Sequence, residues 1–339
     1  MTLDIPTTSR EVHLVRRPHG WPDPSTFAVV ETAVPEVGDG QALVVNDYLS
    51  VDPYMRGRMN DAPSYTPPFA VGEVMTGGAV GTVVASRADG VPVGACVVHN
   101  AGWREVSLVE GAAARVVDTG VAPASAYLGV LGMPGLTAWV GLTTIAQLRA
   151  GEVVFVSGAA GAVGSVAGQL ARLRGAGRVI GSAGSAAKVA HLTGTLGFDA
   201  AFNYKQGPVA EQLAAAAPQG IDVYFDNVGG EHLEAAIGAM RRGARAALCG
   251  SISTYNATEP TPGPRNLGRL VGIRSRLEGF LVSDHDDARP AFLAEAVPAL
   301  ERGGVVMEET VIDGISHAGE AFITMLRGAN TGKMVVRLT

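Results

Sequence analysis

Short apolar runs alternate with amphipathic stretches throughout the second half of the chain. From residue 151 onward the runs predict strands, and apolar residues at helical spacing predict helices. The predicted strands are Val153–Ser157, Arg178–Ala183, Ala200–Asn203, Val223–Asp226, Arg245–Cys249 and Gly279–Val282. The predicted helices are Ala162–Arg174, Ala186–Leu196, Val209–Ala217, Glu231–Ala239 and Ala288–Arg302. This alternation predicts an α/β fold with a doubly wound parallel sheet.

The first part of the chain has a different pattern, in which glycine and proline separate short β-type runs. Runs such as Thr26–Glu31, Gln41–Leu49 and Ala79–Ser86 predict a small barrel or sandwich. A stretch at Leu136–Leu148 has a helical pattern, and Met334–Leu338 is again strand-like. We expect the C-terminal tail to return to the first domain and complete its sheet. The predicted domains are therefore residues 1–125 with 305–339, and residues 126–304.

A glycine turn follows the first predicted strand of the second domain. Residues 152–164 read EVVFVSGAAGAVG, in which a β-branched run precedes Gly158, Gly161 and Gly164. An amphipathic helix follows directly. Such a turn lets the backbone approach a pyrophosphate at the N-terminal end of the helix. The spacing G-x-x-G-x-x-G differs from the usual fingerprint, and the chain contains 45 glycines, so the flanking strand and helix carry the prediction of a dinucleotide site.

The end of the second predicted strand indicates which nicotinamide cofactor binds. An NAD site has Asp or Glu about 20 residues past the glycine turn, where it binds the ribose 2′-hydroxyl. Here Ser182-Ala183-Gly184-Ser185 contains no acid, and Lys188 follows. A lysine supplies a counter-charge to a 2′-phosphate, and Tyr204 after the third strand is placed to reach it. Taken alone, Lys188 reads as a solvated helix residue; together with the missing acid it favours NADP.

Composition narrows the possible functions further. The chain has 339 residues, 47% of them apolar, and a net charge of −6 without a long basic run, which argues against nucleic acid as a partner. No apolar run reaches the ~20 residues of a membrane span, and the N-terminus lacks a signal-peptide pattern. Cys96 and Cys249 are the two cysteines of the sequence and form no C-x-x-C pair. We expect a cytoplasmic protein whose two thiols are free.

Six motifs in order resemble one family. They are Val51–Arg56 (VDPYMR), Gly132–Ala138 (GMPGLTA), Ala160–Ser165 (AGAVGS), Asp226–Gly230 (DNVGG), Ile252–Asn256 (ISTYN) and Asn330–Lys333 (NTGK). Together they span nearly the whole chain. The chain resembles the zinc-independent medium-chain dehydrogenase/reductases of the prostaglandin reductase and leukotriene B4 dehydrogenase group, which includes plant double-bond reductases and bacterial curcumin reductase.

The resemblance implies a fold, a reaction and a set of cofactor residues. The fold is a GroES-like β-barrel domain with a Rossmann domain, and the reaction is NADPH-dependent reduction of the C=C bond of α,β-unsaturated ketones or aldehydes. A homodimer is implied by the resemblance alone. The implied cofactor-binding residues are Gly161, Ala162, Val163, Gly164, Lys188, Tyr204, Asn227, Cys249, Gly250, Ser251, Ile252, Ser253, Thr254, Phe280, Leu281, Val282 and Asn330.

The residues also bear on metal and on catalysis. The stretches VDPYMR and Val71–Val74, where zinc-dependent relatives carry ligands, contain neither Cys nor His, so no metal is expected. Hydride attack at the β-carbon then needs another donor for the developing enolate. We hypothesise that Tyr255 polarises the carbonyl, since a phenol, with an ordinary pKa of about 10, stays protonated at neutral pH. Tyr54 is a second candidate, for which a packed core aromatic is an equal reading.

Two other functions stay open at this stage. One is an NADPH quinone oxidoreductase on a related zinc-free scaffold. The other is an NADPH-binding protein that has lost catalysis. Tyr54, Tyr255 and the cofactor residues are all present, which disfavours the second alternative. The physiological substrate cannot be named from the sequence.

Overall fold

The computed structural model describes residues 5–338, and within them the chain divides into two compact units. The first unit contains the described residues up to Leu128 and from Glu309 onward, and the second runs from Gly129 to Glu308. The boundaries predicted from the sequence are 125/126 and 304/305.

A six-stranded parallel sheet forms the centre of the second unit, counted within the described residues. Its strand order is β10-β9-β8-β11-β12-β13, the order of a Rossmann fold. The strands are β8 (Val153–Val156), β9 (Arg178–Ala183), β10 (Ala200–Asn203), β11 (Ile221–Asp226), β12 (Met240–Leu248) and β13 (Arg276–Gly279). The helices are α2 (Met133–Val140), α3 (Ala162–Leu173), α4 (Ala186–Gly194), α5 (Val209–Ala216), α6 (Gly230–Ala239), α7 (Arg269–Ile273) and α8 (Arg289–Glu301). The predicted doubly wound sheet is confirmed.

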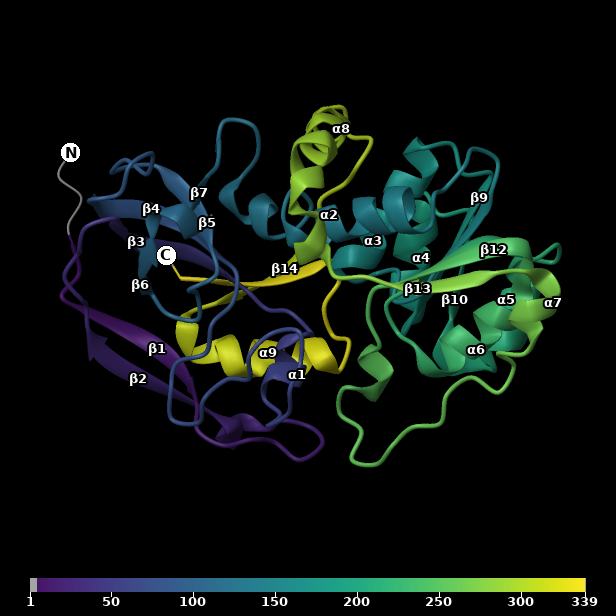
Figure 1. The fold of residues 1–339 in the computed structure, drawn as a ribbon, viewed down its shortest axis with the longest axis horizontal. Helices are drawn as coiled ribbons and strands as arrows, with labels where there is room; N and C mark the ends of the chain where they lie inside the picture. Colours follow the sequence, from purple (N-terminus) through teal and green to yellow (C-terminus); the bar gives the residue numbers. More distant parts are fainter. Residues whose placement is uncertain (1–4, 339) are drawn as a thin grey trace. The chain divides into compact units, whose positions relative to one another are not determined.

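Apolar side chains on both faces explain why these strands lie in the interior. On one face, Phe155 and Tyr224 stack with ring centroids 5.1 Å apart, and Ile180 is fully buried beside them. The helices α5, α6 and α7 pack together on this face, as Figure 1 shows. Such two-sided burial produces the continuous apolar runs that made the strands recognisable in the sequence.

One strand of the second unit was predicted in the wrong place. The sequence indicates a strand at Gly279–Val282, whereas β13 ends at Gly279 and begins with Arg276 opposite Arg245 of β12. The apolar residues Phe280 and Val282 suggested a buried strand. Phe280 is instead a packing residue after the strand, with its ring against Phe225 at a centroid distance of 6.5 Å. The predicted helix at Leu136–Leu148 is also shorter, because α2 gives way to a π-helical turn at Gly141–Ile145.

The first unit is built on a seven-stranded sheet and a two-stranded hairpin, again counted within the described residues. The hairpin is β1 (Thr8–Leu14) with β2 (Phe27–Ala33). The larger sheet contains β3 (Gln41–Ser50), β4 (Ala79–Ser86), β5 (Cys96–His99), β6 (Val106–Glu110), β7 (Arg115–Val116), β14 (Glu309–Asp313) and β15 (Lys333–Arg337). Two helices, α1 (Met55–Arg58) and α9 (Ala318–Leu326), belong to this unit. β15 pairs antiparallel with β3, so the C-terminal tail completes this sheet.

A buried ion pair joins two of the sequence motifs inside the first unit. Lys333, the last residue of the NTGK motif, is 2% exposed, and its Nζ lies 3.2 Å from Oδ1 of Asp52 in the VDPYMR motif. The same Nζ donates hydrogen bonds to the carbonyl oxygens of Val51 at 2.7 Å and Met334 at 2.8 Å. Ser50 donates its hydroxyl to the other carboxylate oxygen of Asp52. These contacts fix the segment that leads to Tyr54.

Burial of this ion pair has an electrostatic cost. Removal from water lowers the pKa of Lys333, while Asp52 and the hydrogen bond between them act in the opposite direction. Glu309 of β14 also lies close enough to Lys333 to interact, and burial raises the pKa of this carboxyl. Removing one partner of such a buried ion pair destabilises the fold, because the other charge is left buried without compensation.

We therefore predict that Lys333→Met lowers the free energy of unfolding by about 3–5 kcal/mol, because Asp52 is left buried and uncompensated. Asp52→Asn combined with Lys333→Met should lose less than the sum of the two single changes. Urea unfolding followed by circular dichroism measures both. Arg337→Ala, which breaks an exposed pair on the same strand, is the matched control and should leave the midpoint almost unchanged. An effect of Lys333→Met no larger than that of Arg337→Ala would contradict the assignment.

Candidate functional site

The glycine turn between β8 and α3 forms a cradle that side chains would fill. A Cβ added at Gly164 would lie 2.4 Å from the carbonyl oxygen of Gly158, and one at Gly161 would lie 3.3 Å from it. Gly158 itself has a φ of +58°, in the left-handed region. Gly161 is the N-cap of α3 and offers no capping side chain. The first-turn N–H groups of a 12-residue helix can therefore bind an anion.

The turn lies at the point where the strand order of the sheet reverses. β8 has β9 on one side and β11 on the other, so the connections leave from here in opposite directions. Ligands of open α/β sheets bind at such a switch point, beyond the carboxyl ends of the strands. Asn227, after β11, is hydrogen-bonded across the switch point to Ser157, after β8. Its Nδ2 donates to the carbonyl of Ser157 at 2.7 Å, and its backbone N–H donates to the Ser157 hydroxyl at 3.0 Å.

A buried carboxylate, that of Asp226, holds the turn after β11 by several hydrogen bonds. Oδ1 of Asp226 accepts hydrogen bonds from the hydroxyls of Tyr224 at 2.7 Å and Ser157 at 3.1 Å, and from the N–H groups of Val228 at 2.9 Å and Gly229 at 2.8 Å. Asp226 is 1% exposed. Burial and the adjacent carboxylate raise the pKa of Tyr224, so its phenol remains a donor. The conformation of the DNVGG motif thus follows from one side chain.

The segment after β12 is hydrogen-bonded to the same turn. Cys249 and Gly250 both donate their N–H groups to the Asp226 carbonyl, at 2.9 and 3.0 Å. Ser253 donates its N–H to the Val228 carbonyl at 3.1 Å, and Ile252 donates to Asn227 at 3.3 Å. Two sequence motifs that are more than 20 residues apart therefore form one structured edge. Burial and the Asp226 carboxylate raise the pKa of the Cys249 thiol to about 12, so the sulfur stays protonated.

Tyr255 folds back over this edge. It follows the 3-10 turn Ile252–Thr254, and its hydroxyl oxygen accepts the Ser251 N–H at 3.4 Å. A Cβ on Gly250 would lie 3.3 Å from the same oxygen, so Gly250 allows the close approach. The phenol is half-buried at the carboxyl edge of the sheet. The structure thus brings Tyr255 to the same edge as Asn227.

Two lysines and a tyrosine gather where β9 and β10 end. Ser185 caps α4 by accepting the Lys188 N–H at 3.3 Å. Burial lowers the pKa of Lys188, and the charge of Lys205 lowers it further. Tyr204 lies close to Gly184, where a Cβ would be 3.0 Å from its hydroxyl oxygen, and the Lys205 ammonium is 5.9 Å from its ring centroid. Like charges held together in this way favour an anionic ligand such as a phosphate.

Sequence reasoning did not assign a role to Lys205. It directly follows Tyr204, and its position after the third strand was the available signal. Its charge lowers the pKa of Lys188, so the two ammonium groups lie within electrostatic reach of each other. His232 on α6 was also not predicted: it is 4% exposed, and its ring lies 5.2 Å from the Tyr204 ring in an edge-on arrangement. Both residues lie far in sequence from the glycine turn.

The remaining predicted cofactor residues of the second unit also lie near the carboxyl edge of the parallel sheet. Phe280, Leu281 and Val282 follow β13 directly and are half-buried. Thr254 donates its hydroxyl to the Ser251 carbonyl at 2.9 Å, which holds the 3-10 turn. Ala162 and Val163 begin α3. All of the predicted cofactor residues of this unit therefore follow the carboxyl ends of parallel strands.

Tyr54 and Asn330 belong to the first unit. Burial and the nearby Asp52 carboxylate raise the pKa of Tyr54, and the Arg58 guanidinium acts in the opposite direction. Arg58 also donates to the carbonyls of Pro67 at 2.9 Å and Thr76 at 3.1 Å, and its guanidinium lies 3.9 Å from the Phe69 ring centroid. Tyr54 is therefore a protonated phenol that lies within the electrostatic reach of an arginine.

Asn330 stands in the loop before β15. Its side-chain N–H donates to the Gly332 carbonyl at 2.7 Å.

Within residues 5–338, no group of three or more His, Cys, Asp or Glu side chains has a spacing suited to a metal ion. Over the same residues, no helix combines the length and the apolar character of a membrane span.

Comparison with known proteins shows which family this chain is similar to. Residues 10–117 match the model of the N-terminal domain of oxidoreductases, and residues 162–301 match the model of zinc-binding dehydrogenases. The NADPH-dependent curcumin reductase of Escherichia coli is 42% identical, over 96% of this chain and 95% of that protein. The NADP-dependent 2-alkenal reductase of Nicotiana tabacum is 40% identical over 98% of both chains. The structure of CurA from Vibrio vulnificus with NADPH has a TM-score of 0.92 and 40% identity, over 97% of this chain and 99% of that one.

Proposed function

The chain belongs to the NADP-dependent alkenal and enone reductases of the medium-chain dehydrogenase/reductase family, and we propose that it reduces the C=C bond of α,β-unsaturated ketones or aldehydes with NADPH. The observation that carries this proposal is the carboxyl edge of the Rossmann sheet. A glycine cradle, a lysine pair and a half-buried phenol are all found along that edge.

The residues present fit NADP. The cradle at Gly158–Gly164 and the N-terminus of α3 would hold the pyrophosphate, and Lys188, Lys205 and Tyr204 would hold the 2′-phosphate. Asn227 and the 249–255 segment would border the cofactor at the switch point. When bound, the cofactor supplies a hydride to the β-carbon of the substrate.

Tyr255 is proposed as the catalytic donor. Hydride addition places negative charge on the substrate carbonyl oxygen, and a protonated phenol aimed at this oxygen stabilises the enolate. The Ser251 N–H fixes the Tyr255 oxygen as an acceptor, which orients the phenol at the sheet edge. A proton from water then adds to the α-carbon, so that the substrate gains one hydride and one proton while NADPH is oxidised to NADP⁺.

Tyr54 is proposed as a second donor to the substrate. Burial and the Asp52 carboxylate raise the pKa of Tyr54, which supports a phenol that stays protonated throughout turnover. The nearby Arg58 is held by the carbonyls of Pro67 and Thr76, in the loop before β4.

Three further properties are proposed. Catalysis proceeds without a metal, because Cys and His are missing from VDPYMR and from Val71–Val74, and the Asp52 carboxylate is paired with Lys333. The protein is cytoplasmic. We also propose a homodimer, since β13 is an edge strand of the six-stranded sheet and the nearby Val271 is 82% exposed. Light scattering would measure the molecular mass of the protein in solution.

The experiment that tests the reaction follows NADPH oxidation at 340 nm against a panel of acceptors. The panel contains a medium-chain 2-alkenal, a linear enone, curcumin, a quinone and a saturated ketone. We expect turnover with the first three compounds and a product that is saturated at the former C=C bond, identified by mass spectrometry. Turnover confined to the quinone would favour a quinone oxidoreductase, and NADPH binding without turnover of any compound would favour a non-catalytic protein.

The lysine pair predicts the cofactor preference. Lys188→Ala should raise the KM for NADPH about 10- to 100-fold, because a charge-assisted contact to a phosphate contributes about 1.5–3 kcal/mol. Lys205→Ala should act in the same direction by a smaller factor, since its ammonium is more exposed. The KM for NADH serves as the internal control and should stay within about twofold. Equal effects on both cofactors would contradict a 2′-phosphate site.

Tyr255→Phe isolates the proposed donor. It removes the hydroxyl but keeps the ring packed over Gly250, so we expect kcat to fall about 10²- to 10³-fold while the KM for NADPH changes little. Tyr127→Phe is the matched control, because its hydroxyl bonds only within the first unit, to the Asp118 carbonyl at 2.6 Å. Wild-type turnover by Tyr255→Phe would rule out the role.

A further inference from the structure

The helix α2 continues into a π-helical turn, Gly141–Ile145, whose backbone hydrogen bonding differs from that of an α-helix. The Ala146 N–H donates to the Gly141 carbonyl, five residues back, at 2.9 Å. The Thr143 hydroxyl donates to the Trp139 carbonyl at 2.7 Å, near the junction of α2 with the turn. Single turns of this kind are rare and occur frequently at functional sites. The sequence predicts an ordinary helix here, so the π-helical turn has no explanation in the local sequence.

Gly141 is the point at which two aromatic rings approach this turn. A Cβ added at Gly141 would lie 2.4 Å from Cε2 of Phe225 and 3.1 Å from Cζ of Phe280. The two rings pack edge to face, with centroids 6.5 Å apart and planes at 87°. Phe225 is fully buried on β11, and Phe280 directly follows β13. Because any side chain at position 141 would displace at least one ring, this glycine sets the distance between the turn and both strands.

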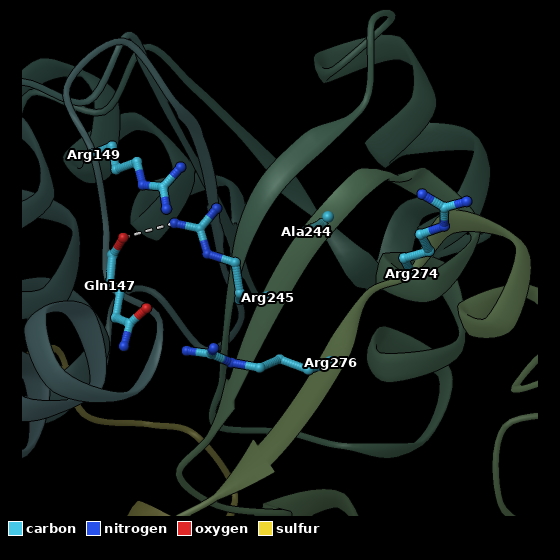
Figure 2. A pocket seen from close by; sticks show the side chains of 7 residues that line it. Gln147, Arg149, Ala244, Arg245, Arg274 and Arg276 are labelled. Atoms are coloured by element: carbon cyan, nitrogen blue, oxygen red, sulfur yellow. Dashed lines mark hydrogen bonds between the residues drawn. The ribbon is translucent and has the colours of Figure 1, made fainter.

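Arginine side chains hold the other end of the turn to the same sheet. Arg276, the first residue of β13, donates to the Ile145 carbonyl at 2.5 Å. Arg245 of β12 donates to the Gln147 carbonyl at 2.7 Å. Figure 2 shows Arg245 and Arg276 extending in the same direction from neighbouring strands. One turn therefore holds β13 at both ends, through Arg276 at its start and Phe280 just after its end.

The sheet topology places the nicotinamide half of the cofactor at these strands. A dinucleotide lies across the switch point, with one mononucleotide on each half of the sheet. The proposed 2′-phosphate site is at the ends of β9 and β10, so the adenosine half lies on that side of β8. The nicotinamide half then belongs at the carboxyl ends of β11, β12 and β13. Phe225 directly precedes Asp226 at the end of β11, and Phe280 begins the segment that follows β13.

We propose that the turn Gly141–Ile145 positions the nicotinamide ring for hydride transfer, acting through Phe280 and the segment 280–282. The proposal rests on the proposed reductase function and adds Gly141 to it as a positioning residue. In support, α2 also packs against the 3-10 segment Val282–Ala288, which continues from the same stretch. Glycine inside a helix costs about 1 kcal/mol relative to alanine, so helix stability does not account for it here. Displacement of reacting atoms by about 1 Å can lower a rate about 100-fold.

Gly141→Ala is the test, with two readouts that do not depend on enone turnover. The fluorescence emission of NADPH bound to the full chain reports the surroundings of its nicotinamide ring, and calorimetry measures the Kd of 2′,5′-ADP, which carries only the adenosine half. We expect a changed emission spectrum and a Kd for 2′,5′-ADP within about twofold of the native value. With an enone, kcat should fall about 10- to 100-fold. The primary isotope effect on kcat, from NADPH deuterated at the transferred hydrogen, should increase because hydride transfer becomes more rate-limiting.

Two control variants separate this role from a general loss of packing. Gly238→Ala adds the same methyl group to α6, where the Cβ would lie an ordinary 3.7 Å from Nδ2 of Asn266. It should leave the emission spectrum, the Kd and kcat unchanged. Phe198→Leu disturbs another buried aromatic side chain of the same unit. It should lower the melting temperature without changing the emission of bound NADPH.

Two further variants test whether the effect passes through the turn and Phe280. Arg276→Met removes the hydrogen bond to the Ile145 carbonyl without adding a clash, so the test does not depend on the folding of Gly141→Ala. It should change the emission spectrum in the same direction, by a smaller amount. Phe280→Leu combined with Gly141→Ala should lower kcat by less than the product of the two single effects, because both act on one contact.

The outcomes distinguish this proposal from the proposed function. Native emission and native kcat in Gly141→Ala would overturn the positioning role, as would an equal emission change in Phe198→Leu. A loss of 2′,5′-ADP affinity as large as the loss of kcat would also overturn it, because the damage would then reach the adenosine half. A native chain that binds NADPH but reduces no enone would instead contradict the proposed function, and the emission spectra would still decide whether Gly141 positions the nicotinamide ring.

Discussion

The buried carboxylate of Asp226 is the contact on which the candidate site depends. Four donors converge on one of its oxygens, and its backbone carbonyl accepts two more N–H groups from the segment after β12. Without this carboxylate, the N–H groups of Val228 and Gly229 in the turn after β11 would lose their acceptor. Because Asn227 and the 249–255 segment are attached to that turn, the position of Tyr255 follows indirectly from Asp226.

The sheet topology explains why such a contact is possible. Parallel strands bring their carboxyl ends to one edge, and the order β8-β11 opens the switch point between two halves of the sheet. Ser157 and Asn227, which are 70 positions apart in the chain, therefore meet across that point. This polar network can be buried because each of its polar groups has a hydrogen-bond partner. Tyr224 illustrates this, since its ring packs on Phe155 while its hydroxyl satisfies Asp226.

Much of this arrangement could be predicted from local patterns in the sequence. β9 and β10 have the predicted bounds, and the glycine turn stands where the β-branched run ends. Local patterns failed where tertiary contacts decide. The apolar Phe280 looked like part of a strand but packs against Phe225, while Arg276, which lies outside the predicted strand, begins β13. The partnership of Lys333 with Asp52 was also invisible, because two motifs 281 positions apart give no periodic signal. Lys205 was passed over because one charge beside a turn reads as solvated until a second charge is seen next to it.

Arginine side chains connect many elements of the Rossmann unit, in a chain of which 17% of the residues are charged. Most arginines of this unit hold the fold: Arg245 joins β12 to the turn before β8, Arg241 binds Asp222, and Arg174 binds Glu295. Positive charge in excess of carboxylate therefore needs another explanation at the carboxyl edge of the sheet, where Lys205 acts on Lys188. The proposed binding of the cofactor 2′-phosphate there would neutralise both lysines.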